Sequence, residues 1–154
     1  MIKNLKLGDS ETAKRALLIQ RLAYRIEADL IGFDGIPPLH ETITDLRASD
    51  ETFIGYYAEE HLLAGVISYL ITAGTLDIGR LVVHPDYFRR GIAQALVQHV
   101  EAISPDVRRI IVSTGRDNTP ARAFYEKLGY QHTGDITLPE GVTISTYEKH
   151  LART

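Results

Sequence analysis

The sequence predicts an α/β (α+β) fold in which about four helices flank a mixed, mostly antiparallel sheet of about six or seven strands. Three observations predict it. Two apolar runs, 53–59 and 62–72, are separated by a short polar turn, which is typical of an antiparallel hairpin. A strand, a helix and a second strand over 75–114 indicate a parallel crossover. Two further strands, 131–138 and 142–149, close the chain.

The N-terminal part is predicted to contain a strand, a long helix, a loop and a short helix. Residues 2–7 alternate between polar and apolar, and Asp9 or Ser10 can cap the helix that follows. Glycines and paired prolines over 32–38 predict a loop, and a short helix is expected at about 41–48. The apolar stripe of the long helix consists of Leu18, Leu22, Ile26 and Leu30.

The C-terminal half alternates strands with helices. After a turn at Gly74, residues 75–83 form a strand, and 109–114 form another. Asn118 is expected to cap the next helix, with Pro120 in its first turn, and Gly129 ends that helix. The helix between the two strands opens at Gly91 and carries one apolar face, made by Ile92, Leu96, Val100 and Ile103.

Composition excludes several classes of protein. The 154 residues show no repeat or linker and fit a single domain, 1–154, which at this size buries roughly 70% of the surface of its unfolded chain. A net charge of −3 disfavours a nucleic-acid partner. Without cysteine there is no disulfide, thiolate metal site or acyl-cysteine intermediate. The absence of a signal-like N-terminus and of a bilayer-long apolar run favours a soluble cytoplasmic protein without a membrane partner.

Residues 81–96 have the character of a phosphate cradle. An apolar strand runs into a proline turn, two arginines and a small-residue step that opens an amphipathic helix. Gly91 and Ala93 let the backbone approach a ligand, and the free N–H groups of the new helix favour an anion. Arg89 and Arg90 add full charges; a solvated helix start is the alternative, but their place directly before Gly91 favours phosphate contact.

A second segment, 118–130, strengthens this interpretation. Steps of three and four residues place Asn118, Ala121 and Tyr125 on one helix face, which Gly129 and Tyr130 follow.

With these two segments, the chain resembles the GNAT superfamily of acyl-coenzyme A dependent N-acetyltransferases over essentially its whole length. The first segment is similar to the family's Gln/Arg-x-x-Gly-x-Gly/Ala pattern and the second to its Asn-x-x-Ala-x-x-x-Tyr-x-x-x-Gly-Phe/Tyr pattern. The resemblance implies a three-layer fold, with the parallel strands that end at Val83 and Thr114 diverging around the pantetheine arm. It also implies acetyl-CoA as cosubstrate and an acetyl transfer to an amine.

The resemblance further implies which residues meet acetyl-CoA. One position departs from the pattern, because Phe88 stands where the family has Gln or Arg, and a side-chain contact there is lost unless Arg89 replaces it. The residues expected to contact the cofactor are Leu81, Val82, Val83, Phe88, Arg89, Arg90, Gly91, Ile92, Ala93, Gln94, Asn118, Phe124 and Tyr125.

Acetyl transfer needs a neutral amine, a stabilised oxyanion and a proton for the departing thiolate. Tyr125 is the expected proton donor, with a packing role as the alternative. Asp77 matches the position of a carboxylate base in some family members; it can equally be a solvent-facing aspartate, with a chain of water molecules taking the proton.

The acceptor is expected to bind against 24–39, where Tyr24, Glu27 and Phe33 are the candidate contacts and carboxylates can attract a cationic amine. A small-molecule primary amine is the favoured acceptor. A protein N-terminus or lysine, or a non-catalytic acyl-CoA binding module, remain as alternatives. Whether the chain forms a homodimer is open.

No metal is predicted, because the six histidines show no ligand pattern such as His-Glu-x-x-His. His84, at the junction of a strand and a turn, is expected to make a structural hydrogen bond.

Overall fold

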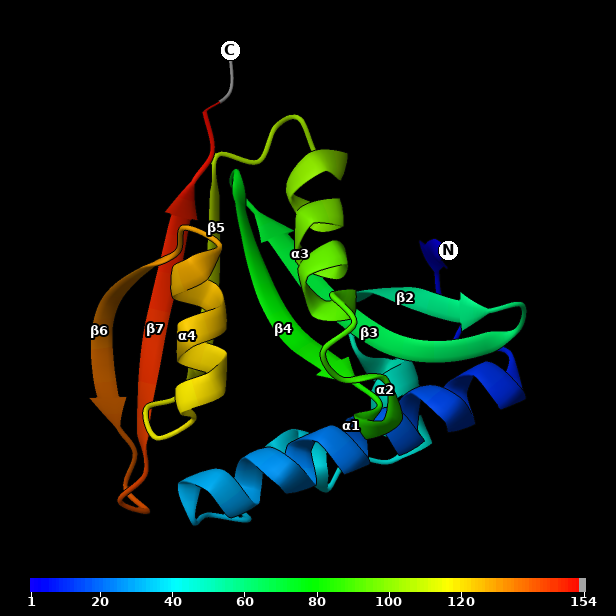
Figure 1. Cartoon of the computed structure of the whole chain (residues 1–154), viewed down its shortest axis with the longest axis horizontal. Coiled ribbons are helices and arrows are strands. Elements are labelled where there is room, and N and C mark those ends of the chain that lie inside the picture. Colours follow the sequence, from blue (N-terminus) through cyan, green and yellow to red (C-terminus); the bar gives the residue numbers. More distant parts are fainter. Residues whose placement is uncertain (153–154) are drawn as a thin grey trace.

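The computed structural model describes residues 1–152, which form one seven-stranded sheet in the order β1-β2-β3-β4-β5-β7-β6 (Figure 1). The strands are β1 (Ile2–Asn4), β2 (Thr52–Glu59), β3 (Leu62–Thr72), β4 (Thr75–Val83), β5 (Arg109–Gly115), β6 (Gln131–Thr137) and β7 (Thr143–His150). β4 and β5 pair in parallel and the other neighbouring strands are antiparallel. The predicted mixed sheet is confirmed.

Helices cover both faces of this sheet. They are α1 (Ser10–Ile31), α2 (Ile43–Ala48), α3 (Ile92–Ile103) and α4 (Thr119–Lys127), with short 3-10 helices η1 (Pro37–Leu39) and η2 (Pro85–Tyr87). One core packs α3 and α4 on the sheet, through residues such as Leu96 and Tyr125. The other packs α1 and α2, through residues such as Leu17 and Leu46. This arrangement is the predicted three-layer fold (Figure 1).

The parallel strands β4 and β5 separate part-way along their length. Their register runs from the Thr75–Arg109 pair to the Ile78–Val112 pair and stops there, although both strands continue. The separation is visible in Figure 1, where α4 lies on the β5 side and α1 crosses below. The diverging ends leave an opening in the middle of the sheet.

A β-bulge marks the point of divergence. Ser68 pairs with Arg80 and Tyr69 with Ile78, so Gly79 is an extra residue in β4. Since side chains alternate along a strand, one extra residue reverses the faces beyond it. Ile78 packs in the core beneath α3, whereas Val82 packs with α1. The bulge therefore turns Arg80 toward the α1 side of the sheet.

The apolar stripe predicted for α1 is not the face that packs on the sheet. Its side chains are 36–48% exposed, whereas Ala13, Ala16 and Ala28 are buried, because small alanines let the helix backbone approach the strands closely. On α3, Ile103 is 39% exposed and Val97 is fully buried, since the helix ends at Ile103, beyond the edge of the core. The exposed stripe residues of α1 are Leu18, Leu22, Ile26 and Leu30.

Several local predictions are confirmed. The Asp9 carboxylate caps α1 by accepting from the Thr12 N–H at 3.0 Å, and Gly32 ends the helix in a left-handed conformation. The first strand is shorter than expected, ending at Asn4 instead of Leu7.

Within residues 1–152, no helix combines the length and apolar character needed to cross a lipid bilayer.

Candidate active site

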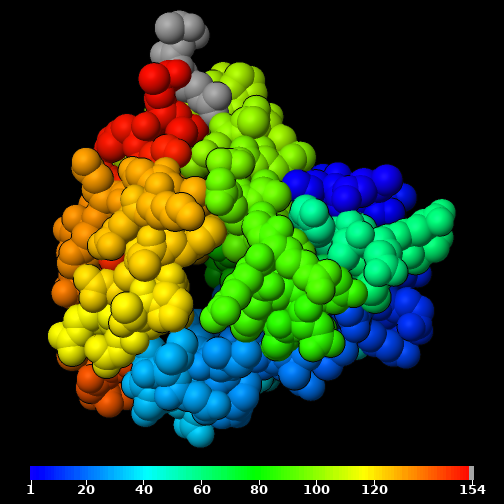
Figure 2. All heavy atoms as spheres, viewed as in Figure 1, coloured from blue at the N-terminus to red at the C-terminus, as the bar shows by residue number. Residues whose placement is uncertain are grey.

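A cavity of about 730 Å³ lies at the C-terminal end of β4. Its walls come from α1, the end of β4, the segment leading into α3, and α4. Figure 2 shows the hollow between yellow α4, the green region around η2 and blue α1. The lining residues are Ala23, Tyr24, Ile26, Glu27, Leu30, Leu81, Val82, Val83, Tyr87, Phe88, Arg89, Gly91, Ile92, Ala93, Gln94, Asn118, Pro120, Ala121, Phe124, Tyr125 and Lys127.

One end of this cavity is formed by the start of α3. Arg89 and Gly91 both have positive φ angles, 63° and 76°, which turn the chain sharply before the helix begins. Gly91 is the N-cap and supplies no side-chain hydrogen bond, so backbone N–H groups of the first turn are free for a ligand. Ile92, Ala93 and Gln94 line the cavity beside them. Free N–H groups and a helix N-terminus are suited to the pyrophosphate of coenzyme A.

The two neighbouring arginines differ in position. Arg89 lines the cavity, together with the half-exposed ring of Phe88. The Arg90 guanidinium lies over the Tyr87 ring, 5.0 Å from its centroid, and Arg90 is not among the lining residues. Only Arg89 of the pair therefore brings its charge to the cavity wall within the part of the chain that the structure describes.

Tyr125 forms the inner wall on α4. It is 5% exposed and is enclosed by aromatic rings, with the Phe124 centroid 5.1 Å and the Tyr130 centroid 5.6 Å away. Burial raises the pKa of its hydroxyl well above the usual range, and the negative charge of Glu27 raises it further. The phenol is therefore protonated at neutral pH. Two turns earlier, Asn118 caps α4 by accepting the Ala121 N–H at 3.2 Å, as expected.

A smaller cavity of about 90 Å³ adjoins the first, in the opening between β4 and β5. Glu27 reaches it from α1, and its Oε1 accepts long hydrogen bonds from the Thr114 hydroxyl (3.3 Å) and the Gly115 N–H (3.5 Å). Burial raises the pKa of Tyr24, with Glu27 as the next cause. The residues that line both cavities are Tyr24, Glu27, Leu81, Asn118, Ala121 and Tyr125.

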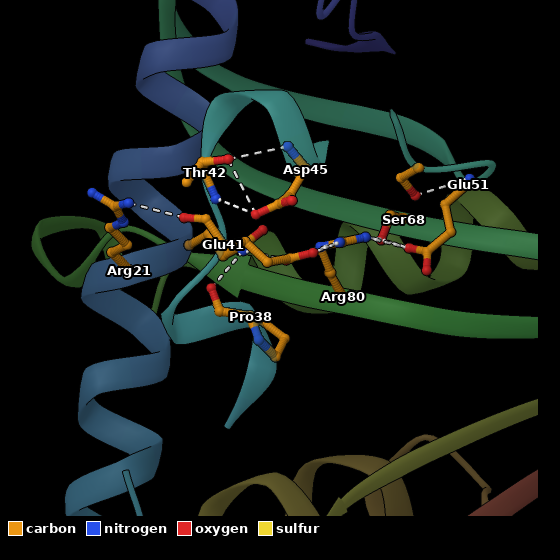
Figure 3. A network of polar contacts seen from close by, with 10 residues as sticks. Arg21, Pro38, Glu41, Thr42, Asp45, Glu51, Ser68 and Arg80 are labelled. Atoms are coloured by element: carbon orange, nitrogen blue, oxygen red, sulfur yellow. Dashed lines mark hydrogen bonds and ion pairs between the residues drawn. The ribbon is translucent and has the colours of Figure 1, made fainter. Parts of the chain in front are cut away.

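Arg80 lines the smaller cavity and is 7% exposed. Its guanidinium donates to both Glu41 oxygens at 2.9 Å and to Glu51 at 2.5 Å, as Figure 3 shows. Gln20 donates to Glu41 at 2.8 Å and to the Pro38 carbonyl at 2.7 Å. This Arg80 network joins α1, the connection between α1 and α2, and the start of β2 to strand β4.

The fold gathers most of the predicted site residues around the cavities. All the predicted cofactor contacts except Arg90 line the larger one, as do Tyr24 and Glu27. Phe33 stacks on Gly35 in the loop after α1 and does not line either cavity. Asp77 also lies outside both; burial raises its pKa, with Glu51 as a second cause. His84 makes a structural hydrogen bond, its Nδ1 accepting from the Asp86 N–H at 3.1 Å.

Sequence reasoning did not identify Arg80, Thr114 or the two stripe residues Ile26 and Leu30 as parts of the site. A signal existed for Arg80, because a charged residue that directly precedes the apolar run 81–83 of a strand requires buried partners. The described residues contain no group of three or more His, Cys, Asp or Glu side chains placed to hold a metal ion.

The model of the Acetyltransferase (GNAT) family matches residues 19–130. The chain belongs to the GNAT family. This GNAT protein is 40% identical over 153 residues to the UPF0157 protein YqkA of Bacillus subtilis (strain 168), a match that covers 99% of the chain but 44% of YqkA.

Solved structures agree on the fold. The ribosomal-protein-S18-alanine N-acetyltransferase of Escherichia coli superposes with a TM-score of 0.76 at 15% identity, covering 100% of this chain and 95% of that one. The PaiA N-acetyltransferase of Thermoplasma acidophilum, solved in complex with coenzyme A, gives a TM-score of 0.74 at 20% identity, with 98% of each chain covered. The chain therefore has the family and the fold of the GNAT acetyltransferases.

Proposed function

We propose that the GNAT protein transfers the acetyl group of acetyl-CoA directly to a primary amine of a small molecule, in a ternary complex without a covalent acyl-enzyme. The observation that carries this proposal is the place of Tyr125, whose side chain lines both the larger and the smaller cavity. A thioester in the first cavity and an amine in the second would meet beside its hydroxyl.

The larger cavity fits the shape and charge of coenzyme A. The helix start at Gly91 and the charge of Arg89 would hold the pyrophosphate. Main-chain groups of β4 over 81–83 have no β5 partner beyond Ile78 and would pair with the pantetheine amides. Phe88 and Phe124 add apolar surface to the lining of this cavity.

The chemistry balances with the groups present. The ammonium gives up one proton and attacks the carbonyl carbon, and the C–N bond forms as the C–S bond breaks. The thiolate takes a proton from the Tyr125 hydroxyl. The nitrogen loses its second proton as the amide forms, and this proton returns to the Tyr125 oxygen. The first proton leaves through a carboxylate or water to solvent. Glu27 lines the cavities and Asp77 does not, which favours Glu27 over Asp77 as the carboxylate that meets the amine.

The test pairs acetyl-CoA binding by calorimetry with a thiol-release assay on a panel of amines. The expected result is binding together with release that depends on the amine. Tyr125→Phe should lower turnover at least tenfold and leave the acetyl-CoA Kd nearly unchanged, because the ring stays and only the proton is lost. Equal turnover in the variant would remove Tyr125 from the role of donor.

Other outcomes point to the two alternatives. Release with a peptide N-terminus or lysine peptide, and with no small amine, would indicate a protein acceptor. Binding without release from any acceptor would indicate a non-catalytic module.

A further inference from the structure

The smaller cavity limits the size of what can enter it. Its volume of about 90 Å³ is well below the roughly 150 Å³ of an engineered cavity that accepts a benzene ring. Ile78 and Val112, from the two diverging strands, line it, and Tyr125 lines both this cavity and the larger one. An ammonium group on a short methylene stem fits this space. A ring needs more room, and a branch on the carbon that bears nitrogen would take up much of the volume that a methylene stem leaves free.

The charge of the same cavity is negative. Glu27 and Arg80 are its charged lining residues within 1–152. Arg80 is already engaged by Glu41 and Glu51, and its Nε–H is buried and inaccessible. The cavity therefore holds no positive charge free to receive a carboxylate, and an unpaired buried charge is costly.

Glu27 is the carboxylate available to a cation. It forms no ion pair with any residue of the described part of the chain, and its hydrogen bonds to β5 are long, at 3.3 and 3.5 Å. These bonds hold one oxygen toward the opening between the strands. Tyr24 and Tyr125 line the same cavity as Glu27, and after burial its charge is the next cause that raises the pKa of both.

From this size and charge we infer that the acceptor presents a primary amine on an unbranched methylene, R–CH2–NH3⁺, with no carboxylate beside it, and that Glu27 selects it. The inference rests on the proposed function, since it names the chemical class of the amine in that transfer. R itself lies outside the smaller cavity and is not restricted by it. Ammonium groups on a ring or on a branched carbon, and α-amino acids, are disfavoured.

Three amines of similar size separate these effects: butylamine, 2-aminobutane and glycine. Measured by thiol release with the intact protein, kcat/KM should be at least tenfold higher for butylamine than for either of the others. 2-Aminobutane tests the volume of the cavity, because it moves the branch to the carbon that bears nitrogen. Glycine tests the charge, because it keeps the methylene and adds a carboxylate.

Glu27→Gln should lower kcat/KM for butylamine at least tenfold, and it should narrow the difference in kcat/KM between butylamine and glycine. The matched control is Asp29→Asn, an exposed carboxylate on the same helix that lines neither cavity, which should leave both values unchanged. Calorimetry with acetyl-CoA should give the same Kd for all three proteins.

Two results would overturn the inference in different ways. Efficient transfer to glycine or 2-aminobutane, equal to that of butylamine, removes the inference and leaves the acetyltransferase intact. Acetyl-CoA binding without transfer to any amine removes the proposed function and the inference together.

Discussion

At the scale of single residues, Gly91 illustrates how backbone conformation shapes the site. Its φ of +76° is strained for any side chain, but a Cβ there would have no heavy atom within 4 Å. Gly91→Ala should therefore act through backbone strain alone and lower the free energy of unfolding by about 1 kcal/mol. Because the turn before α3 would shift, acetyl-CoA binding should weaken several-fold. Gly8 is the matched control, because its surroundings are equally open and its φ is not positive. Calorimetry and thermal unfolding would measure both effects, and equal behaviour of the two variants would contradict this view.

At the scale of elements, the Arg80 network attaches the connection between α1 and α2 to β4 (Figure 3). Arg80→Met would leave the Glu41 and Glu51 carboxylates without their partner in a largely buried place, and should lower the free energy of unfolding by about 3–5 kcal/mol. Arg109→Met breaks a more exposed pair with Glu148 and should cost less than about 1 kcal/mol. Urea unfolding of the two variants gives the comparison. Similar losses of unfolding free energy in the two variants would mean that the Arg80 network does not stabilise the attachment of this connection to β4.

At the scale of the whole molecule, Tyr24, Tyr125 and Tyr130 share one electrostatic property, since burial is the main cause that raises the pKa of each. The unfolded chain releases these protons near pH 10 while the folded protein keeps them. The contribution of these three tyrosines to the free energy of unfolding should therefore be constant below about pH 10 and fall as the pH rises further. The slope of Tm between about pH 9 and 11 should become shallower when all three are changed to Phe. An unchanged slope would assign the alkaline loss to other groups.

Much of the molecule follows from short stretches of sequence. Asn118, Pro120 and Gly129 bound α4, and Gly91 starts α3, because caps and turns depend on neighbours only a few residues away. The segment that approaches coenzyme A in the proposal lies within one such stretch. For this reason the parts of the larger cavity that come from 81–94 and 118–125 could largely be predicted, whereas Ile26 and Leu30 of α1 could not.

The smaller cavity could not be predicted in this way. Glu27 meets Thr114 across 87 residues of sequence, and the bulge at Gly79 reverses the faces of β4 so that Arg80 turns toward α1. The stripe on α1 is exposed although its spacing is that of a buried face, because the alanines of the adjacent face pack on the sheet. The sequence by itself determined the family, the elements and the segment at the start of α3 that lines the larger cavity, through local caps, turns and periodicity. Only the tertiary structure decided which carboxylate reaches Tyr125, since that depends on strand register and on the close approach of distant helices.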